Sequence, residues 1–586
     1  MIAEERNCQN CKSEFVIEPE DFQFYERVKV PPPTWCPSCR LRRRLVFWNE
    51  KNLFRKKEAI KGETIFSSFP DSSNIKIYER DYWWSDAWDP MDYGREYDFS
   101  KTFFEQFKTL SRDVPWASRS VQVLENSDYC DQASRAKNCY LCFDFGDSEN
   151  CMYGNMGRYL KECMEFSDVQ SNELCYENYN TGNCFQARFA VDSYNLSNCW
   201  FMKDCSDCND CFGCVGLRHK KYHIFNQPYD KESYAKKIKE FNTSSYAAFQ
   251  KIRKTVLDFW LKYPNKYAHV QRNERSEGEY LYNCKNVNES YLIIDSAENV
   301  KYSQISSDRV KDCMDYTNWG INAELIYESI SCGENVSNLK FCFDCWPSSS
   351  NLEYCIGCHS SNNLFGCVSL RKKQFCIFNK QYSEQEYYKL RDKIIASMNS
   401  LPYKDALGKT YRYGEFLPPE TSPLAYNESC AVEYMPLTEE QSLSQGFGWR
   451  EIEEREYEPT TSSSALPDSI EDATSAIVKE IISCEGCARV YRILEKELEF
   501  YKRFGLPIPR LCPKCRHSER DKFRTPIGLW PRKCQCSGVG SLNSVYKNQV
   551  VHVHGSEKCQ IEFRTPYAPD RPEIVYCEQC YNAEVV

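Results

Sequence analysis

Residues 198–218, NCWFMKDCSDCNDCFGCVGLR, place five cysteines within 21 residues, several of them after Asn or Asp and before an aromatic residue. The same arrangement recurs through residues 126–229, where the cysteines of two interleaved series lie 21 or 24 residues apart. Short apolar segments that alternate with Asn, Asp, Gly and Ser turns at a regular spacing are typical of a β-solenoid. The stretch therefore predicts stacked coils in which equivalent residues form ladders.

This cysteine-rich region is repeated at residues 288–382 with a shift of about 149 to 153 residues. Phe212–Arg218, FGCVGLR, returns as Phe365–Arg371, FGCVSLR. In this register Cys151 matches Val300 and Cys199 matches Leu352. Because an aliphatic side chain can replace a buried thiol but not a metal ligand, most of these cysteines are predicted to pack in the core.

One cluster remains open between packing and metal binding. It is a dense run of Cys-x-x-Cys pairs that could hold an iron–sulfur cluster or a zinc ion. Its members are Cys205, Cys208, Cys211 and Cys214.

The two ends of the chain resemble each other as well. Four cysteines near the N-terminus match four near the C-terminus at a single shift of 476 residues, and each set forms two Cys-x-x-Cys pairs. Four thiolates make a closed tetrahedral zinc site that stabilises a small module. The predicted ligands are Cys8, Cys11, Cys36 and Cys39 at the front and Cys484, Cys487, Cys512 and Cys515 at the rear.

The rear module contains the residues for a further zinc site. Its predicted ligands are Cys534, Cys536, Cys577 and Cys580, with Cys559, His552 and His554 as possible substitutes. The front copy lacks the equivalent cysteines and has Glu79 and Tyr82 in place of the last pair. The sequence thus predicts Zn²⁺ at two sites and at a third in the rear module.

These modules resemble a bacterial family of zinc-ribbon or treble-clef domains. The motif runs Cys8-Gln-Asn-Cys11, Phe22, Phe24-Tyr25, and then Trp35-Cys36-Pro37-Ser38-Cys39-Arg40. The whole chain is similar to bacterial proteins that carry such domains around a cysteine-rich repeat region. The resemblance implies zinc binding and assigns no activity.

The predicted fold is multidomain and mainly β, with helical caps, and has a duplicated β-solenoid-like middle between the two zinc modules. Helical spacing of apolar residues predicts a cap after each solenoid copy, and the aromatic run from Trp83 to Phe107 predicts a cap, a packing surface or a ligand platform. The expected segments are 1–60 (N-terminal zinc-ribbon module), 61–122 (aromatic-rich connector), 123–229 (first repeat), 230–270 (helical cap), 271–382 (second repeat), 383–452 (helical cap and irregular segment), 453–474 (linker) and 475–586 (C-terminal double zinc module).

The 35 cysteines come without a signal-like N-terminus or a long apolar run, so we expect a reducing cytoplasm and no membrane, rather than a secreted disulfide-rich protein. The net charge of −9 excludes a uniformly basic surface, yet residues 40–57 and 502–533 are both rich in Lys and Arg. Arginines beside aromatic residues are typical of RNA binding. The candidate nucleic-acid contacts are Arg40, Arg42, Arg43, Arg44, Arg55, Lys56, Arg516, Arg520, Lys522 and Arg524.

Three classes of function follow. The predicted function is that of a non-enzymatic zinc protein that binds nucleic acid, RNA in particular, through the basic modules. The first alternative is a protein–protein scaffold built on the solenoid. The second alternative is a solenoid enzyme that acts on a polymer through a carboxylate cluster. Asp144, Asp147, Asp168 and Asp192 are the residues considered for it. No catalytic residue and no small-molecule substrate is predicted, because no catalytic motif is present.

Overall fold

The computed structural model describes residues 2–451, 457–487 and 489–585. It has two compact units, each assembled from distant segments of the chain. Unit 1 comprises Met1–Ser120, Ala268–Arg450 and Ile527–Leu529, and unit 2 comprises Val121–Tyr267, Glu451–Pro526 and Trp530–Val586. The front cysteine module therefore belongs to the same unit as the second solenoid, and the rear module belongs to the same unit as the first solenoid.

The chain is mainly β with a β-solenoid middle, as predicted, and the solenoids have about 21 turns in all. In unit 2, Phe143 pairs with Asn155 and Asn155 with Ser167 in parallel register, so each coil has 12 residues. The strands are β7 (Val121–Glu125), β8 (Asp131–Lys137), β9 (Phe143–Glu149), β10 (Asn155–Arg158), β11 (Ser167–Gln170), β12 (Tyr179–Gly182), β13 (Val191–Tyr194), β14 (Asn209–Phe212), β15 (Lys221–Ile224) and β16 (Gln227–Pro228). The 24-residue cysteine spacing in the sequence is therefore two coils, and the repeat is shorter than that spacing suggested.

Every third residue of a coil is a left-handed corner, as at Asn150, Tyr153 and Met156, whose φ angles are 55°, 57° and 53°. The residue after a corner points inward. Asn, Asp and Gly are the residues that adopt this conformation most readily, and Asn and Asp indeed recur at these corners. Three-residue sides make the interior narrow, so Cys and Ala fill many of its inward positions, together with a few larger residues such as Phe145 and Leu160.

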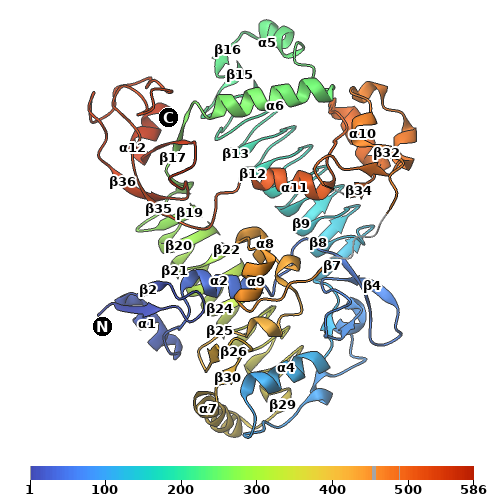
Figure 1. The fold of residues 1–586 in the computed structure, drawn as a ribbon, viewed down its shortest axis with the longest axis vertical. Coiled ribbons are helices and arrows are strands. Elements are labelled where there is room, and N and C mark those ends of the chain that lie inside the picture. Colours follow the sequence, from blue (N-terminus) through green and yellow to red (C-terminus); the bar gives the residue numbers. More distant parts are fainter. Residues whose placement is uncertain (1, 452–456, 488, 586) are drawn as a thin grey trace. The chain divides into compact units, whose positions relative to one another are not determined.

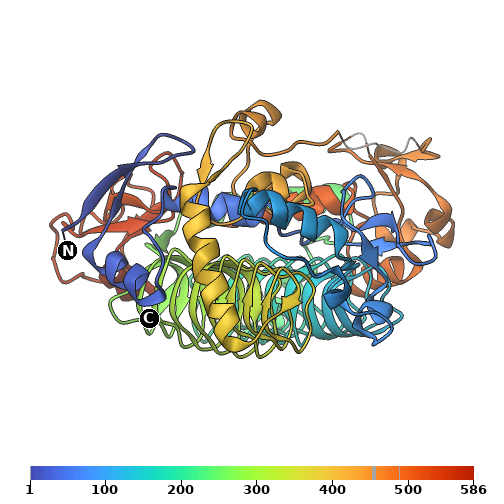
Figure 2. The same cartoon turned by 90° about the horizontal axis from the view of Figure 1, so that it is seen from below.

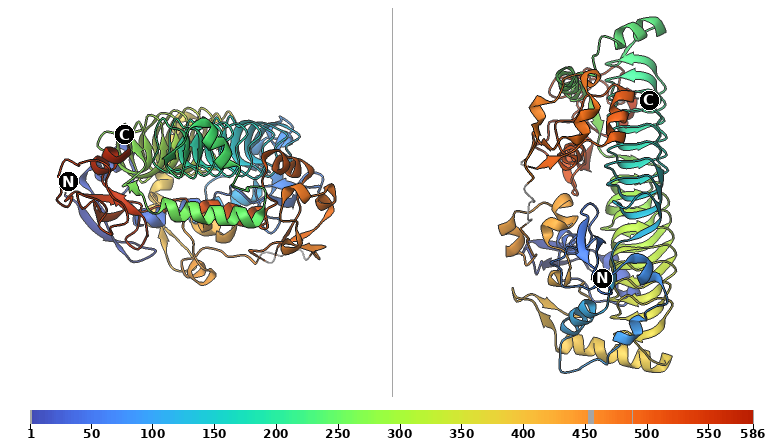
Figure 3. Two further views of the ribbon diagram at one scale, coloured as in Figure 1. Left: turned by 90° about the horizontal axis from the view of Figure 1, so that it is seen from above. Right: turned by 90° about the vertical axis from the view of Figure 1, so that its right-hand side faces the viewer.

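In unit 1 the second solenoid has wider coils in its central part. Tyr291 pairs with Gln304 and Gln304 with Thr317, a repeat of 13 residues, because one corner takes two left-handed residues, such as Asp308 and Arg309. Figure 3 (right) shows the coils edge-on as a stack. The strands are β18 (Val270–Gln271), β19 (Glu277–Tyr282), β20 (Lys285–Ile294), β21 (Glu298–Lys301), β22 (Gln304–Ser307), β23 (Val310–Gly320), β24 (Ala323–Gly333), β25 (Val336–Lys340), β26 (Ser350–Glu353), β27 (Asn362–Phe365), β28 (Gln374–Ile377) and β29 (Lys380–Gln381).

Helices cover the solenoids, as the apolar spacing predicts. In unit 2, α5 (Lys231–Ile238) and α6 (Tyr246–Trp260) follow the first solenoid. In unit 1, α7 (Glu384–Ser400) crosses the last coils of the second one at the end of the stack (Figure 2 and Figure 3). The aromatic run contributes α4 (Phe103–Asp113), whose Phe103 packs on Tyr354 and Phe365 of the coils with ring centroids 5.1 and 5.4 Å apart. This part of the run serves as a packing surface.

The two cysteine modules have the same order of elements. The front module has β1 (Glu4–Asn7), β2 (Glu14–Ile17), α1 (Pro19–Val28), α2 (Pro37–Leu45), β3 (Phe54–Lys57), β4 (Thr64–Ser67), β5 (Ile77–Tyr78) and α3 (Arg80–Trp84). The rear module has β33 (Ile482–Ser483), β34 (Val490–Tyr491), α10 (Glu495–Phe504), α11 (Pro513–Asp521), β35 (Trp530–Lys533), β36 (Glu562–Thr565), β37 (Ile574–Tyr576) and α12 (Glu578–Val585). In each, the last strand pairs with a short strand that precedes a solenoid, β6 (Trp116–Ala117) or β17 (Pro264–Lys266).

The predicted linker 453–474 is only partly described, since residues 453–456 lie outside the described ranges. Its remainder packs in unit 2: Ile470 is buried, and Asp468 accepts a hydrogen bond of 2.9 Å from the Ala247 N–H at the start of α6. Among the described residues, no helix combines the length and apolar character needed to cross a membrane.

Replacing Cys208 by Ala tests the role of the solenoid cysteines. Its thiol is fully buried and donates to the Ser206 carbonyl over 3.2 Å. We expect the free energy of unfolding of unit 2 to fall by about 1–2 kcal/mol, with unchanged metal content measured by mass spectrometry. Loss of one metal ion per chain would instead mark this cysteine as a ligand.

His359 makes the stability of unit 1 depend on pH. Burial lowers the pKa of this imidazole to about 3, and its Nδ1–H donates to the Trp346 carbonyl. Because the pKa is about 6.5 in the unfolded chain, the neutral form stabilises the fold above that pH, and stability is lost as pH falls toward 3. Between pH 6.5 and 5.5 urea unfolding in excess zinc should show a loss of about 1 kcal/mol. The His359→Asn variant should lack this part of the pH dependence, and an unchanged slope would contradict the assignment.

Candidate metal centres

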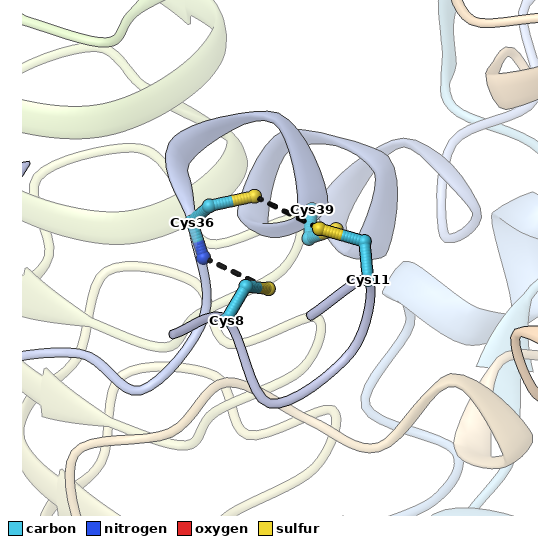
Figure 4. A group of neighbouring side chains, drawn as sticks. All are labelled: Cys8, Cys11, Cys36 and Cys39. Carbon is cyan, nitrogen blue, oxygen red and sulfur yellow. Dashed lines mark hydrogen bonds between the residues drawn. The ribbon is translucent and has the colours of Figure 1, made fainter. Parts of the chain in front are cut away.

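The front cysteine cluster joins the turn between β1 and β2 to the start of α2. Cys8 and Cys11 come from the turn, and Cys36 and Cys39 from the helix (Figure 4). All four sulfur atoms lie within 4.8 Å of one another. The Cys36 N–H donates to the Cys8 sulfur over 3.2 Å, and the positive end of α2 also favours thiolates here. The cluster can hold a metal ion, as the sequence predicts.

The rear cluster repeats this geometry. Cys484 and Cys487 lie on the turn between β33 and β34, and Cys512 and Cys515 at the start of α11, again within 4.8 Å. The Cys512 N–H donates to the Cys484 sulfur over 3.2 Å. Burial by itself would raise the pKa of Cys484, but the backbone N–H groups around its sulfur lower that pKa to about 7. A partly ionised thiol favours metal binding, because the thiolate is the form that binds the metal.

A third cluster lies farther along the rear module, and its membership differs from the prediction. Cys534, Cys577 and Cys580 are joined by Cys559 in a buried four-sulfur group. Cys536, which was expected in this set, belongs instead to a second group with His552, His554 and Cys580. Cys534 directly follows β35, and Cys559 lies just before β36.

In the front module carboxylates occupy the positions of two of these thiols. Glu58 follows β3 as Cys534 follows β35, and Glu79 precedes α3 as Cys577 precedes α12. Glu58 accepts the backbone N–H of Ile60 over 2.7 Å, and Glu79 accepts that of Asp81 over 2.7 Å. In residues 2–120 the only grouping of potential metal ligands is the four-cysteine cluster. The described part of the front module thus offers one group of converging ligands.

The open cluster in the first solenoid does not form a metal site among the described residues. Its four cysteines are buried, and they are not among the groups of potential ligands whose atoms all lie within 4.8 Å of one another. Each thiol donates to the carbonyl two residues earlier, for example Cys205 to Lys203 and Cys211 to Asn209, both over 3.2 Å. Short contacts of a buried sulfur with a backbone carbonyl are typical of packed thiols, so the geometry favours packing for these cysteines.

The basic residues of α2 lie against β23 and β24 of the second solenoid (Figure 1). Arg40 and Arg44 both reach Asp315, over 2.7 and 3.1 Å, and all three side chains are at most 1% exposed. Arg43 bridges Glu328 and Glu415 over 2.8 and 2.9 Å. Burial raises the pKa of Glu328 although Arg43 opposes the change. Three guanidinium groups face three carboxylates, so the interface is charge-balanced.

Unit 2 contains the same arrangement. Arg516 and Arg520 of α11 both contact Glu165 at a corner of the first solenoid, over 2.6 and 2.5 Å. Arg516 also donates to Glu497 over 3.2 Å. Glu165 and Glu497 are fully buried. In both units, then, two arginines four residues apart on the module helix bind one carboxylate of the solenoid. We call each such triplet, Arg40–Arg44–Asp315 and Arg516–Arg520–Glu165, an arginine clamp.

The clamps correct the prediction that these arginines contact nucleic acid. Arg40, Arg43, Arg44, Arg516 and Arg520 are buried in ion pairs and cannot reach a phosphate in this fold. Lys56 is buried as well and donates to the Ser73 carbonyl over 2.8 Å. The remaining candidates are closer to the surface: Arg42 and Arg524 are half-buried, and Arg55 and Lys522 are exposed.

The four aspartates considered for catalysis lie at corners of the first solenoid. Asp144, Asp168 and Asp192 occupy the same corner of every second coil, and Asp147 the next corner. Coils stack about 4.8 Å apart, so these three carboxylates are separated by about 10 Å along the ladder. These three residues lie along one face of the solenoid, and their carboxylates do not meet at a single point.

No known protein family matches the chain, and no curated protein does. Among solved structures, UDP-N-acetylglucosamine acyltransferase from Campylobacter jejuni aligns with 50% of this chain and 97% of its own, at 9% identity and a TM-score of 0.09. A score this low supports neither a shared fold nor a shared function. The zinc-ribbon resemblance therefore remains a prediction from the motif.

Proposed function

We propose that this chain is a zinc-stabilised scaffold whose solenoids bind a protein partner and whose zinc modules are structural. The observation that carries the proposal is the arginine clamp in each unit. The residues that an RNA-binding module would expose instead fix the module helix to its own solenoid. Four converging thiols leave no open position for catalysis and match the preference of Zn²⁺.

The partner surface that we propose is formed by the corner ladders that the modules leave uncovered. Asn138 donates to Asn150 over 3.1 Å in unit 2, and Asn286 donates to Asn299 over 2.9 Å in unit 1. Such amide chains fix exposed polar groups at the spacing of the coils, about 4.8 Å. Repeat proteins use regular extended surfaces of this kind to bind other proteins.

A reducing compartment, the cytoplasm, is part of this proposal, because all 35 cysteines lack disulfide partners in the structure. Elemental analysis of the purified chain tests the identity of the metal. Zinc as the only stoichiometric metal supports the proposal, and stoichiometric iron would contradict it.

Photo-crosslinking in cells tests the scaffold. A photoreactive amino acid is placed at the exposed ladder residues Asn195 and Asn335, and at Lys254 on α6 as a matched exposed control. We expect the same protein adduct from both ladder positions, none from the control, and no change after nuclease treatment. A nuclease-sensitive adduct, or RNA that co-purifies and is lost at moderate salt, would favour the RNA alternative, since phosphate binding depends steeply on salt.

A further inference from the structure

The two overlapping ligand groups of the rear module share one residue, Cys580 of α12. We propose that they bind two zinc ions at once, with the Cys580 thiolate bridging them. The first ion would be held by Cys534, Cys559, Cys577 and Cys580, and the second by Cys536, His552, His554 and Cys580. The chain would then hold four zinc ions, one in the front module and three in the rear module.

The orientation of His552 supports the second ion. Its Nε2 lies 2.8 Å from a carboxylate oxygen of Glu584, and both side chains are at most 1% exposed. The carboxylate fixes the proton on Nε2, so Nδ1 presents its lone pair. That Nδ1 lies 3.2 Å from the Cys536 sulfur. A zinc-binding histidine characteristically gives its other N–H to a carboxylate in this way.

His554 is oriented in the same manner by a different acceptor. Its Nδ1 lies 2.6 Å from the Glu557 carbonyl oxygen, which can only accept, so the proton is on Nδ1. Nε2 is left with a lone pair and lies 3.2 Å from the Cys580 sulfur. Both imidazoles therefore direct a free nitrogen at a thiol, one at each end of the second group.

The hydrogen bonds to the Cys536 sulfur also favour metal binding. This sulfur accepts the Gly538 N–H over 3.4 Å and the Asn548 side-chain amide over 3.3 Å. These donors stabilise a thiolate. One zinc with four thiolates carries two net negative charges, whereas two zinc ions with five thiolates and two neutral imidazoles carry one. The second ion thus lowers the charge that the fold must bury.

The length of the β35–β36 connection agrees with this assignment. In the front module β3 and β4 are joined by residues 58–63, whereas β35 and β36 are joined by residues 534–561. The longer rear connection carries Cys536, His552, His554 and Cys559. It contains little regular structure of its own, so metal ions supply the cross-links that would hold it in place.

Native mass spectrometry of the full chain gives the number of zinc ions directly. We expect four ions in the wild type and three in the His552→Ala/His554→Ala variant, because only the second ion loses its ligands. The matched control replaces two histidines near the surface of the first solenoid, His219→Ala/His223→Ala, and should retain four. Three ions in the wild type, unchanged by loss of His552 and His554, would overturn the proposal.

Cobalt substitution tests the bridge itself. Two Co²⁺ ions joined by one thiolate should couple antiferromagnetically, lowering the magnetic moment per cobalt at low temperature relative to the variant that lacks both imidazoles. In the Cys580→Ser variant both ions lose their shared ligand, and the metal content should fall toward two. Four ions without magnetic coupling would contradict a bridging thiolate. The two remaining four-cysteine sites serve as an internal reference for folding in each variant.

Discussion

Replacing Asp315 by Asn should lower the free energy of unfolding of unit 1 by about 3–5 kcal/mol. The substitution keeps the shape of the side chain but leaves Arg40 and Arg44 without their shared counter-charge at a site where all three residues are at most 1% exposed. Removing one partner of a buried ion pair is costly because the other charge stays buried and uncompensated. Urea unfolding followed by tryptophan fluorescence measures the change.

Asp308→Asn is the matched control for this prediction. Asp308 lies at another corner of the same solenoid, half exposed, beside Arg309 at 3.7 Å. An exposed pair of this kind contributes at most about 1 kcal/mol, so its loss should have little effect. Equal effects of the two substitutions would show that the clamp does not fix the module to the solenoid.

The Cys36→Ser variant should lose one zinc ion and the fold of the front module together. Structural zinc sites contribute about 10–16 kcal/mol to the folding of small modules, and serine cannot replace a thiolate ligand. We expect zinc content to fall by one per chain and the front module to become sensitive to protease, with cleavage near α1 and α2.

A solenoid cysteine of the same unit provides the control. Cys345 is fully buried and donates to the Phe343 carbonyl over 3.5 Å, and it belongs to none of the ligand groups found among the described residues. The Cys345→Ser variant should retain all its zinc. Loss of zinc from this variant, or full zinc retention in Cys36→Ser, would contradict the division between structural metal ligands and packing thiols.

The sequence predicts the solenoid and the two primary clusters because both leave a regular spacing of residue types. The comparison of Cys151 with Val300 identifies the packing cysteines correctly, since only a core position tolerates that exchange. The length of the coil is harder to derive. Ala, Ser, Phe and Leu occupy inward positions as well as Cys. The spacing of the cysteines alone therefore does not show the 12-residue period.

The arginines show why a basic run is ambiguous. Arg40 and Arg44 lie four residues apart, a spacing that serves equally for a phosphate-binding face and for an internal clamp. The decisive carboxylate, Asp315, lies far away in the sequence and at a corner where Asp is common for conformational reasons. Its match to Glu165 in the other solenoid copy is a signal that could have been found, because Arg40 and Arg516 also match.

The rear ligands could be predicted as a set but not divided into groups. Cys536 follows Cys534 so closely that a single site is the simplest interpretation. Only the path of the β35–β36 connection, which brings His552 and His554 beside Cys536 and Cys580, separates the two groups.

Hydrogen exchange with and without metal tests the central claim most directly. The claim is that the zinc modules are structural and that their helices α2 and α11 are fixed to the solenoids. After removal of metal by a chelator, backbone amides of α2 and α11 should lose their protection, while those of β10–β12 and β24–β26 should keep it. Restoring zinc should restore protection in both helices. Unchanged protection of α2 and α11 without metal, or equal loss throughout the solenoids, would contradict the account.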